Sequence, residues 1–212
     1  MSNLKDILIN KTICKSMWFM RQAGRYLPEF RKIRLQNKNF IKICLDSKLS
    51  SEITLQPIKR FELDSAIIFS DILMVPYALG QDVEFLKNDG PRLSQFDLRS
   101  LSKWNDKKFS NTLNPIYKAI EKTRKKLNKE KSLISFIGAP WTLLVYMLGI
   151  KKGKQDIQLK KLPHEKKIIN EIINRLINFL CIHIKNQINA GADVVQIFDS
   201  WAGLISNENL DE

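Results

Sequence analysis

Apolar residues recur with the 3.6-residue period of an α-helix in three segments of the chain. This pattern predicts helices over residues 49–61, 115–127 and 163–189. The longest of them carries an i, i+4 stripe that a second set of isoleucines widens. The stripe and the second set are Ile168, Ile172, Leu176, Leu180 and Ile184, with Ile169, Ile173 and Ile177. Pro115 suits a first helical turn, and Gly191 is placed to end the last helix.

Short apolar runs between these helices predict β-strands. Residues 65–69 and 132–137 are rich in apolar, often β-branched side chains, which is typical of buried strands, and residues 193–198 predict another strand. Residues 82–86 alternate between apolar and polar and predict an accessory strand, followed by a turn at residues 88–91. Because strand and helix signals alternate, the pattern favours an α/β fold with a parallel sheet covered by helices.

Each buried strand is followed by polar or small residues. Residues 70–71, 138–141 and 199–203 come directly after the strands, and the loop at Arg21 follows the apolar residues 17–20 in the same way. In a (β/α)8 TIM barrel the loops after the strands converge on one face and build the site there. The pattern therefore favours a barrel, with an open doubly wound sheet as the alternative.

The loop Arg21-Gln22-Ala23-Gly24-Arg25 has the composition of an anion site. Arg21 and Arg25 carry planar guanidinium groups that stay charged and grip carboxylates bidentately. Gly24 allows a tight turn and a close approach of the backbone to a ligand, and Gln22 can add a neutral hydrogen bond. The loop predicts a ligand with several carboxylates.

Composition narrows the class of protein. A hydrophobic fraction of 44% and a charged fraction of 27% are ordinary for a globular chain, and no apolar run is long enough for a membrane span. The net charge of +13 comes mostly from lysines, without the interleaved aromatics that stack on bases, so we expect a solvated face and no nucleic-acid partner. Cys14, Cys44 and Cys181 lie in apolar surroundings, which favours buried thiols over disulfides.

Cys181-Ile182-His183 resembles a fragment of a metal site. Residues two apart on a helix point to different sides, so we expect a core cysteine and an ordinary helix histidine instead. His164, at a helix start, is expected to be solvated. The sequence predicts no metal.

Four stretches, in their order and spacing, resemble uroporphyrinogen decarboxylases across nearly the whole chain. They are Trp18-Phe19-Met20-Arg21-Gln22-Ala23-Gly24-Arg25, Ile67-Ile68-Phe69-Ser70-Asp71-Ile72-Leu73, Gly138-Ala139-Pro140-Trp141-Thr142-Leu143 and Gln196-Ile197-Phe198-Asp199-Ser200-Trp201-Ala202-Gly203. The resemblance implies a cytoplasmic (β/α)8 barrel that needs no cofactor and is a homodimer in its full-length form. It also implies the reaction: removal of CO2 from the four acetate arms of uroporphyrinogen III, giving coproporphyrinogen III for haem and chlorophyll synthesis.

The resemblance also assigns site residues. Asp71, Arg21 and Tyr146 are implied to be catalytic, with Asp71 accepting from the four pyrrole N–H groups. The implied substrate-binding residues are Arg21, Gln22, Ala23, Gly24, Arg25, Asp71, Phe136, Tyr146 and Ser200. From the residues alone other interpretations stay open: the arginines as surface ion-pair partners, Asp71 and Ser200 as caps, and Tyr146 and Phe136 as core aromatics. The proton donor also stays open between Arg21, a relayed water and a substrate-bound proton.

The chain departs from the family pattern in two places. Residues 148–154 keep only part of the glycine-rich turn that usually follows the tyrosine helix. Barrels of this type need about 250 residues, whereas this chain has 212 and lacks a counterpart of the family's substrate-contacting histidine. The sequence thus predicts a single domain over residues 1–212, truncated at its C-terminus.

Two other functions remain as alternatives at this point. One is a corrinoid-linked methyltransferase of the same superfamily, with zinc on the Cys181 thiolate. The other is a non-catalytic fragment or a basic protein associated with nucleic acid, which would use the net charge of +13.

Overall fold

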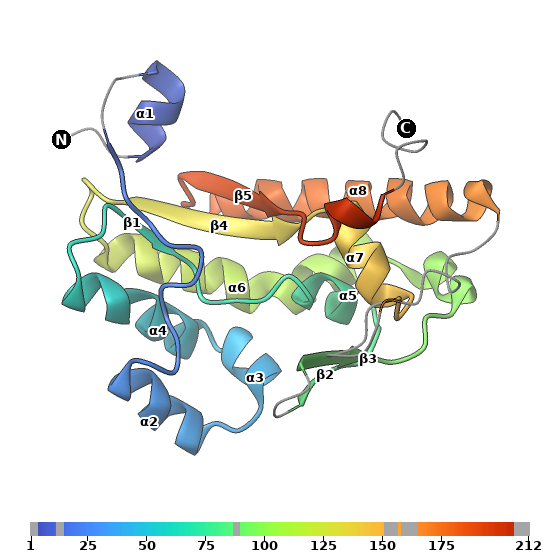
Figure 1. Ribbon diagram of the computed structural model, residues 1–212, viewed down its shortest axis with the longest axis horizontal. Helices are drawn as coiled ribbons and strands as arrows, with labels where there is room; N and C mark the ends of the chain where they lie inside the picture. Colours follow the sequence, from blue (N-terminus) through green and yellow to red (C-terminus); the bar gives the residue numbers. More distant parts are fainter. Residues whose placement is uncertain (1–3, 12–14, 87–89, 151–156, 158–164, 206–212) are drawn as a thin grey trace. The chain divides into compact units, whose positions relative to one another are not determined.

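The computed structural model describes residues 4–11, 15–86, 90–150, 157 and 165–205 (Figure 1). The chain divides into two compact units. The first comprises residues 1–71, 112–136 and 184–196, and the second residues 72–111, 137–183 and 197–212. Several helices and strands run from one unit into the other, and the expectation of a single domain stays a prediction.

The first unit contains the amino-terminal helices and most of a sheet. Its helices and strands are α1 (Leu4–Asn10), α2 (Pro28–Gln36), α3 (Phe40–Cys44), α4 (Ser47–Arg60) and β1 (Ser65–Ile67), with the larger parts of α6 (Asp106–Lys126), β4 (Ser132–Gly138) and β5 (Val194–Phe198) and the end of α8 (Lys166–Asn189). The helix predicted over residues 49–61 is α4, and the three predicted strands are β1, β4 and β5. Strands β1 and β4 are mostly buried, whereas β5 is half-buried and its Ile197 is exposed.

The sheet has the order β1-β4-β5 and its strands are parallel. Ser65 pairs with Ser132 and Ile67 with Ile134 in parallel register. The Asp193 N–H donates to the Leu133 carbonyl at 2.8 Å, at the start of β5. This parallel sheet, whose strands alternate with helices along the chain, confirms the α/β class; among the described residues the sheet does not close on itself.

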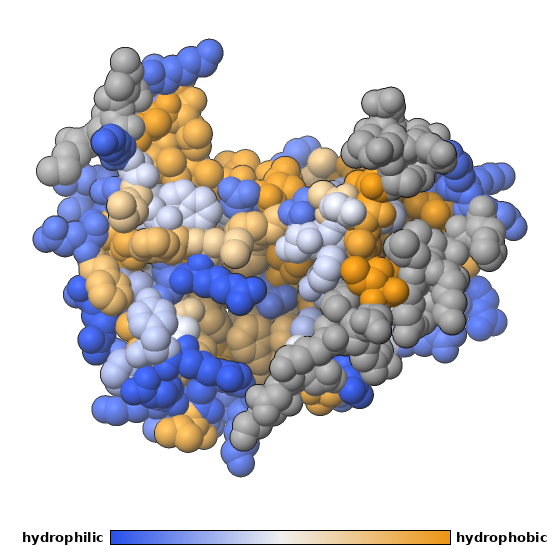
Figure 2. Space-filling model, in the orientation of Figure 1, coloured by the Kyte–Doolittle hydropathy of each residue, from blue (hydrophilic) through white to orange (hydrophobic). Residues whose placement is uncertain are grey.

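Side-chain caps and an apolar cluster hold the helices of the first unit. Asp46 accepts hydrogen bonds from the Lys48 and Leu49 N–H groups and starts α4. The cluster consists of Leu27, Phe30, Ile33, Ile43 and Ile53, with Ala23, Leu49 and Phe69 packed against it. On α1, by contrast, Leu8 and Ile9 are exposed. Figure 2 shows hydrophobic surface, in orange, over this helix.

Arg124 and Asp193 join the amino ends of β4 and β5. The guanidinium donates to the Asp193 carboxylate at 2.7 Å, and that same carboxylate accepts from the Leu133 N–H at 2.9 Å. The guanidinium also donates to the carbonyls of Leu127, Asn128 and Lys131. Only 22% of the Arg124 side chain is exposed, so this charge is held by a full set of partners.

Gly191 ends α8, as predicted. Its φ of 104° is left-handed, and the N–H groups of Gly191 and Ala192 donate to the carbonyls of Ile188 and Gln187. These are the two hydrogen bonds of a Schellman motif. A Cβ on Gly191 would lie 3.1 Å from Cγ of Arg124, so the helix end and the Arg124 stem are closely packed.

The second unit contains a hairpin and several helices. Its complete elements are α5 (Met74–Ala78), β2 (Val83–Leu86), β3 (Gly90–Leu93), the 3-10 helices η1 (Leu98–Lys103) and η3 (Ala202–Leu204), and α7 (Pro140–Met147). The predicted accessory strand is β2, which pairs with β3 in antiparallel register. The turn prediction was wrong for Gly90 and Pro91, which lie in β3; Asn88 and Asp89 lie outside the described residues.

A chain of aromatic contacts forms much of the core of the second unit. Phe109 meets Phe179 at a centroid distance of 5.0 Å, Phe179 meets Trp104 at 5.6 Å, and Phe109 also meets the His183 ring at 6.2 Å. His183 is buried and burial lowers its pKa to about 3, whereas Cys181 is exposed. The prediction for this pair was therefore wrong: the histidine, not the cysteine, is on the core side of α8.

Three further details of the helix predictions need correction. The helix predicted to begin at Pro115 is α6, which begins at Asp106 and contains Pro115 in its interior. Ile177, expected on the apolar face of α8, is 40% exposed, while Ile172 and Leu176 are fully buried. Pro163 and His164 lie outside the described residues. None of the helices in the part of the chain that the structure describes is long and apolar enough to cross a membrane.

Candidate functional site

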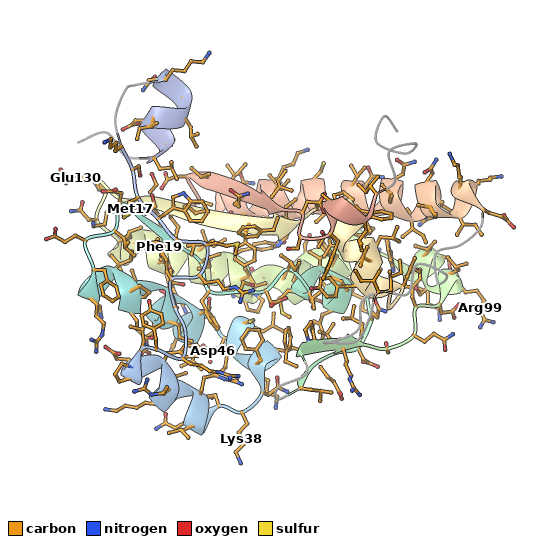
Figure 3. The ribbon with its side chains drawn as sticks, in the orientation of Figure 1. Met17, Phe19, Lys38, Asp46, Arg99 and Glu130 are labelled. Carbon is orange, nitrogen blue, oxygen red and sulfur yellow. The ribbon has the colours of Figure 1, made fainter. Side chains whose placement is uncertain are left out.

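The loop of residues 21–25 follows an extended segment that lies beside β1 (Figure 3). Met17 fixes the start of this segment: its N–H donates to the Asp64 carboxylate at 2.6 Å, and its carbonyl accepts from the Asp64 N–H at 3.2 Å. Met17 and Phe19 are 62% and 57% exposed, and the segment is not a regular strand. The sequence analysis compared the apolar residues 17–20 with the three predicted strands, but this segment is not a strand.

Gln22 is the buried residue of the loop, at 3% exposure. Its Nε2 donates to the Ser65 carbonyl at 2.8 Å, and its Oε1 accepts from the Ile67 N–H at 3.2 Å. One side-chain amide therefore makes the two hydrogen bonds that a neighbouring strand would offer to β1. Both ends of the Gln22 amide are engaged with the backbone.

Arg21 and Arg25 are exposed, and among the described residues no carboxylate pairs with either guanidinium. Ala23 and Gly24 are half-buried between them. Arg31, on α2, donates to the carbonyls of Arg25 and Tyr26 at 2.9 and 3.2 Å, which ties down the far end of the loop. The loop thus presents two cations that have no carboxylate partner within the described part of the chain, on a backbone that is fixed at both ends.

Besides Arg31, a second arginine of α2 lies near the loop: Arg34, which the sequence analysis missed. Burial lowers the pKa of Arg34, and the Arg25 charge lowers it further, so the two guanidinium groups lie close enough to repel. Arg34 lies 5.6 Å from the centroid of the Phe40 ring and donates to the Asn37 and Lys38 carbonyls. Its place one helical turn after Arg31 was the only signal in the sequence.

Asp71 follows β1 at its carboxyl end and is half-buried. Burial raises the pKa of the Cys44 thiol well above its usual value; the Asp71 charge raises it too, while Arg34 lowers it. Asp71, Cys44, Arg34 and Arg25 therefore form one electrostatic neighbourhood in the first unit. The prediction of a buried thiol holds for Cys44, and Phe136 is half-buried on β4.

Tyr146 and Ser200 belong to the second unit. Tyr146 is half-buried on α7, and its ring meets the Trp201 ring at a centroid distance of 6.1 Å. Thr142, also on α7, donates to the Asp199 carboxylate at 2.6 Å and accepts from the Trp201 N–H at 3.0 Å. The Thr142 hydroxyl thus connects α7 to the residues after β5, where Ser200 is exposed.

Metal ligands do not gather in the described part of the chain: no three His, Cys, Asp or Glu side chains lie together there. The candidate site is instead one of arginines and a single carboxylate. It suits a polyanion that also carries hydrogen-bond donors.

Comparison with known proteins shows to which family the chain belongs. The profile of the uroporphyrinogen decarboxylase (URO-D) family matches residues 11–212. The chain belongs to the uroporphyrinogen decarboxylase family. The residues of the loop, of β1 and of β5 all lie within the stretch that the family profile covers.

Individual members of the family are similar over most of this chain. The uroporphyrinogen decarboxylases of Rickettsia felis and Rickettsia canadensis are each 46% identical to it over 198 residues, which is 92% of this chain. That stretch makes up 57% and 58% of those two proteins. The chain thus spans little more than half the length of the curated relatives it matches.

The fold has a relative among solved structures as well. A methyltransferase from Methanosarcina mazei superposes with a TM-score of 0.71, covering 94% of this chain and 59% of the methyltransferase. The two sequences are 14% identical, so this likeness concerns the fold alone.

Proposed function

We propose that this chain is the substrate-binding amino-terminal part of an enzyme that converts uroporphyrinogen III to coproporphyrinogen III by removing CO2 from four acetate arms. The observation that carries the proposal is the loop of residues 21–25. It holds Arg21 and Arg25 without carboxylate partners among the described residues, in a chain of the uroporphyrinogen decarboxylase family. A substrate with eight carboxylates would supply anionic partners for both guanidinium groups.

Asp71 has the central chemical role in this proposal. Its carboxylate accepts from the pyrrole N–H groups of the macrocycle and stabilises the cationic, ring-protonated pyrrole that forms on the way to decarboxylation. The bond between the methylene carbon and the carboxylate then breaks, CO2 leaves, and the electron pair flows into the ring. A proton added to the methylene carbon completes the methyl group, and the proton on the ring then leaves to restore the neutral pyrrole, so that one proton is consumed for each CO2 released. A fixed anion near the developing positive charge favours the transition state over the ground state.

The other predicted residues have supporting roles. Arg21 and Arg25 bind substrate carboxylates, Arg21 is a candidate for the catalytic set, and Ala23 and Gly24 offer backbone to the substrate. Arg34 adds positive charge beside Arg25. We assign Tyr146 and Ser200 to hydrogen bonds with the substrate, and Phe136 to the apolar border of the site. The enzyme needs no metal or organic cofactor in this scheme.

We further propose that the complete protein is a (β/α)8 barrel, a homodimer and a cytoplasmic enzyme. The sheet order supports the barrel: β1, β4 and β5 neighbour one another in chain order, without the reversal that marks a doubly wound sheet. The family membership supports the substrate and the dimer.

The decisive experiment incubates the protein with uroporphyrinogen III under anaerobic conditions and separates the products by acid number. Stepwise loss of carboxylates to coproporphyrinogen, with release of CO2, is the expected result. The 212-residue chain and a version extended to the length of its relatives should be assayed in parallel, because the chain spans 57% of its Rickettsia felis relative. An extended protein that binds uroporphyrinogen without releasing CO2 would refute the proposal.

A further inference from the structure

The two-sided hydrogen bonding of the Gln22 amide has a consequence beyond substrate contact. Gln22 is 3% exposed, and its amide pairs with Ser65 and Ile67 on the edge of β1. The next N–H along the strand, that of Ile68, points the other way and donates to Ile134 of β4 at 2.9 Å. Strand β1 therefore has the sheet on one edge and a glutamine side chain on the other.

We propose that Gln22 is a positioning residue. Its side-chain amide makes the hydrogen bonds that a neighbouring strand would make with β1, and so holds Arg21 and Arg25 in place beside β1. Arg21 is the residue next to it in the chain, and the Gln22 carbonyl itself accepts from the Tyr26 hydroxyl. The Gln22 side chain fixes the near end of the loop as Arg31 fixes the far end. Only the effect on catalysis rests on the proposed function.

The chemistry of the amide makes this role specific. At this position one atom must donate, to the Ser65 carbonyl, and the other must accept, from the Ile67 N–H. An ionised carboxylate has acceptors only and would face the Ser65 carbonyl with a second acceptor. A protonated carboxyl group has one donor and one acceptor, so it can make both bonds again.

Two variants test this chemistry without any substrate. Gln22→Met keeps the volume and removes both hydrogen bonds, and should lower the hydrogen-exchange protection of the Ile67 amide about tenfold at every pH. Gln22→Glu should lose the same protection at neutral pH and regain it in acid, as the introduced carboxyl protonates at a pKa above about 4.3. Residues 21–25 should lose and regain protection together with Ile67, while the Ile68 amide serves as the internal reference.

The catalytic consequence is measured on the extended protein with uroporphyrinogen. Gln22→Met should lower kcat/KM about 10- to 100-fold per folded molecule, because both guanidinium groups lose their fixed position. The matched control is Gln81→Met, since Gln81 is also buried and its Nε2 donates to two carbonyls, of Ser94 and Met147. That variant should cost stability and leave kcat/KM of the folded enzyme unchanged.

The positioning role is overturned if Gln22→Met leaves the protection of Ile67 and of residues 21–25 as in the wild type. It is also overturned if Gln22→Glu stays unprotected in acid, since then a donor and an acceptor do not suffice. If Gln22→Glu shows this pH pattern in exchange while the extended wild-type protein shows no decarboxylation, the positioning role stands and the proposed function is refuted instead.

Discussion

Arg124 and Arg25 are both arginines of the first unit, but their guanidinium groups have opposite surroundings. Arg124 lies at the amino ends of β4 and β5, is mostly buried, and donates to one carboxylate and three carbonyls. Arg25 is exposed on a loop, with no carboxylate partner among the described residues and another guanidinium, that of Arg34, nearby. The Arg124 charge is satisfied within the fold, whereas we propose that the Arg25 charge binds a ligand.

The difference shows how one arginine serves stability at the amino ends of the strands, while we propose that another, on an exposed loop, serves binding. A buried guanidinium destabilises the fold unless all its donors find partners, so its partners become part of the folding energy. An exposed one keeps its hydration until a ligand replaces the water, and therefore adds little to stability. In parallel α/β folds the carboxyl ends of the strands hold ligands, which is where Asp71 lies.

The largest effect should follow from neutralising Asp71. Asp71→Asn keeps the shape of the side chain and removes the anion that we assign to the transition state. We expect kcat for uroporphyrinogen to fall by about 10²- to 10³-fold, corresponding to roughly 3–4 kcal/mol, with a much smaller change in substrate affinity. Steady-state kinetics and binding of a non-reacting porphyrin on the extended protein measure the two separately. Equal losses in kcat and affinity would contradict this role.

Removing Arg124 should affect the other half of the comparison. Arg124→Met keeps the stem and leaves Asp193 without its main partner, so the free energy of unfolding should fall by about 3 kcal/mol in urea titrations. Lys5→Met is the matched control, since Lys5 lies 3.7 Å from the same carboxylate but is 48% exposed. It should cost less than about 1 kcal/mol. A changed kcat/KM in folded Arg124→Met would show that Arg124 serves function as well as stability, and would contradict the contrast with Arg25.

Acid tests stability without changing either arginine, because guanidinium groups stay charged. The pKa of His183 is about 3 in the folded protein, lowered by burial, and about 6.5 in an unfolded chain. The free energy of unfolding is therefore unaffected by His183 above about pH 6.5. As the pH falls from there toward 3, the free energy of unfolding decreases by about 1.4 kcal/mol per pH unit, because the unfolded chain binds the proton that the buried ring does not. Urea titrations between pH 7 and pH 4 measure this slope. In His183→Phe the slope should flatten; an unchanged slope would assign the acid sensitivity to other groups.

The smallest effect should come from Arg21→Lys, which keeps the charge and removes the planar fork. We expect KM for uroporphyrinogen to rise by about tenfold or less, with stability unchanged, because bidentate contact is lost while attraction remains. Arg99→Lys changes an exposed arginine of the second unit, which pairs with Asp97 at 3.2 Å, and serves as the control; Figure 3 labels Arg99, whose side chain is 92% exposed. A rise in KM of the same size in both variants would mean that Arg21 has no specific role in binding the substrate.

Two clear apolar patterns account for the successful part of the sequence analysis. The helix α4 was predicted from its 3.6-residue period, and the strands β1, β4 and β5 from short runs of apolar residues between the helices. Pro115 misled the prediction of α6, since a proline suits a first turn yet is also tolerated inside a helix of 21 residues. The start of α6 is marked instead by Asn105, whose side chain accepts from the Lys108 N–H.

The site was harder to predict where contacts depend on tertiary structure. The loop of residues 21–25 was recognised from its composition, but nothing in the sequence says that the Gln22 amide would meet the backbone of β1. Arg34 resembled an ordinary helix-surface residue until α2 and α3 placed it beside Phe40. Cys181 was wrongly predicted to lie in the core instead of His183. Residues two apart lie on different sides of a helix, but their spacing does not say which of the two sides faces the core.

Gly191 shows how a single position can lie beyond the reach of compensating mutations. Its left-handed backbone disfavours any side chain, and a Cβ there would also press on the Arg124 stem. Shortening Arg124 would relieve the second conflict only, and would cost the pair with Asp193 as well. A suppressor screen that starts from Gly191→Ala should therefore recover the original glycine far more often than a change at a second site.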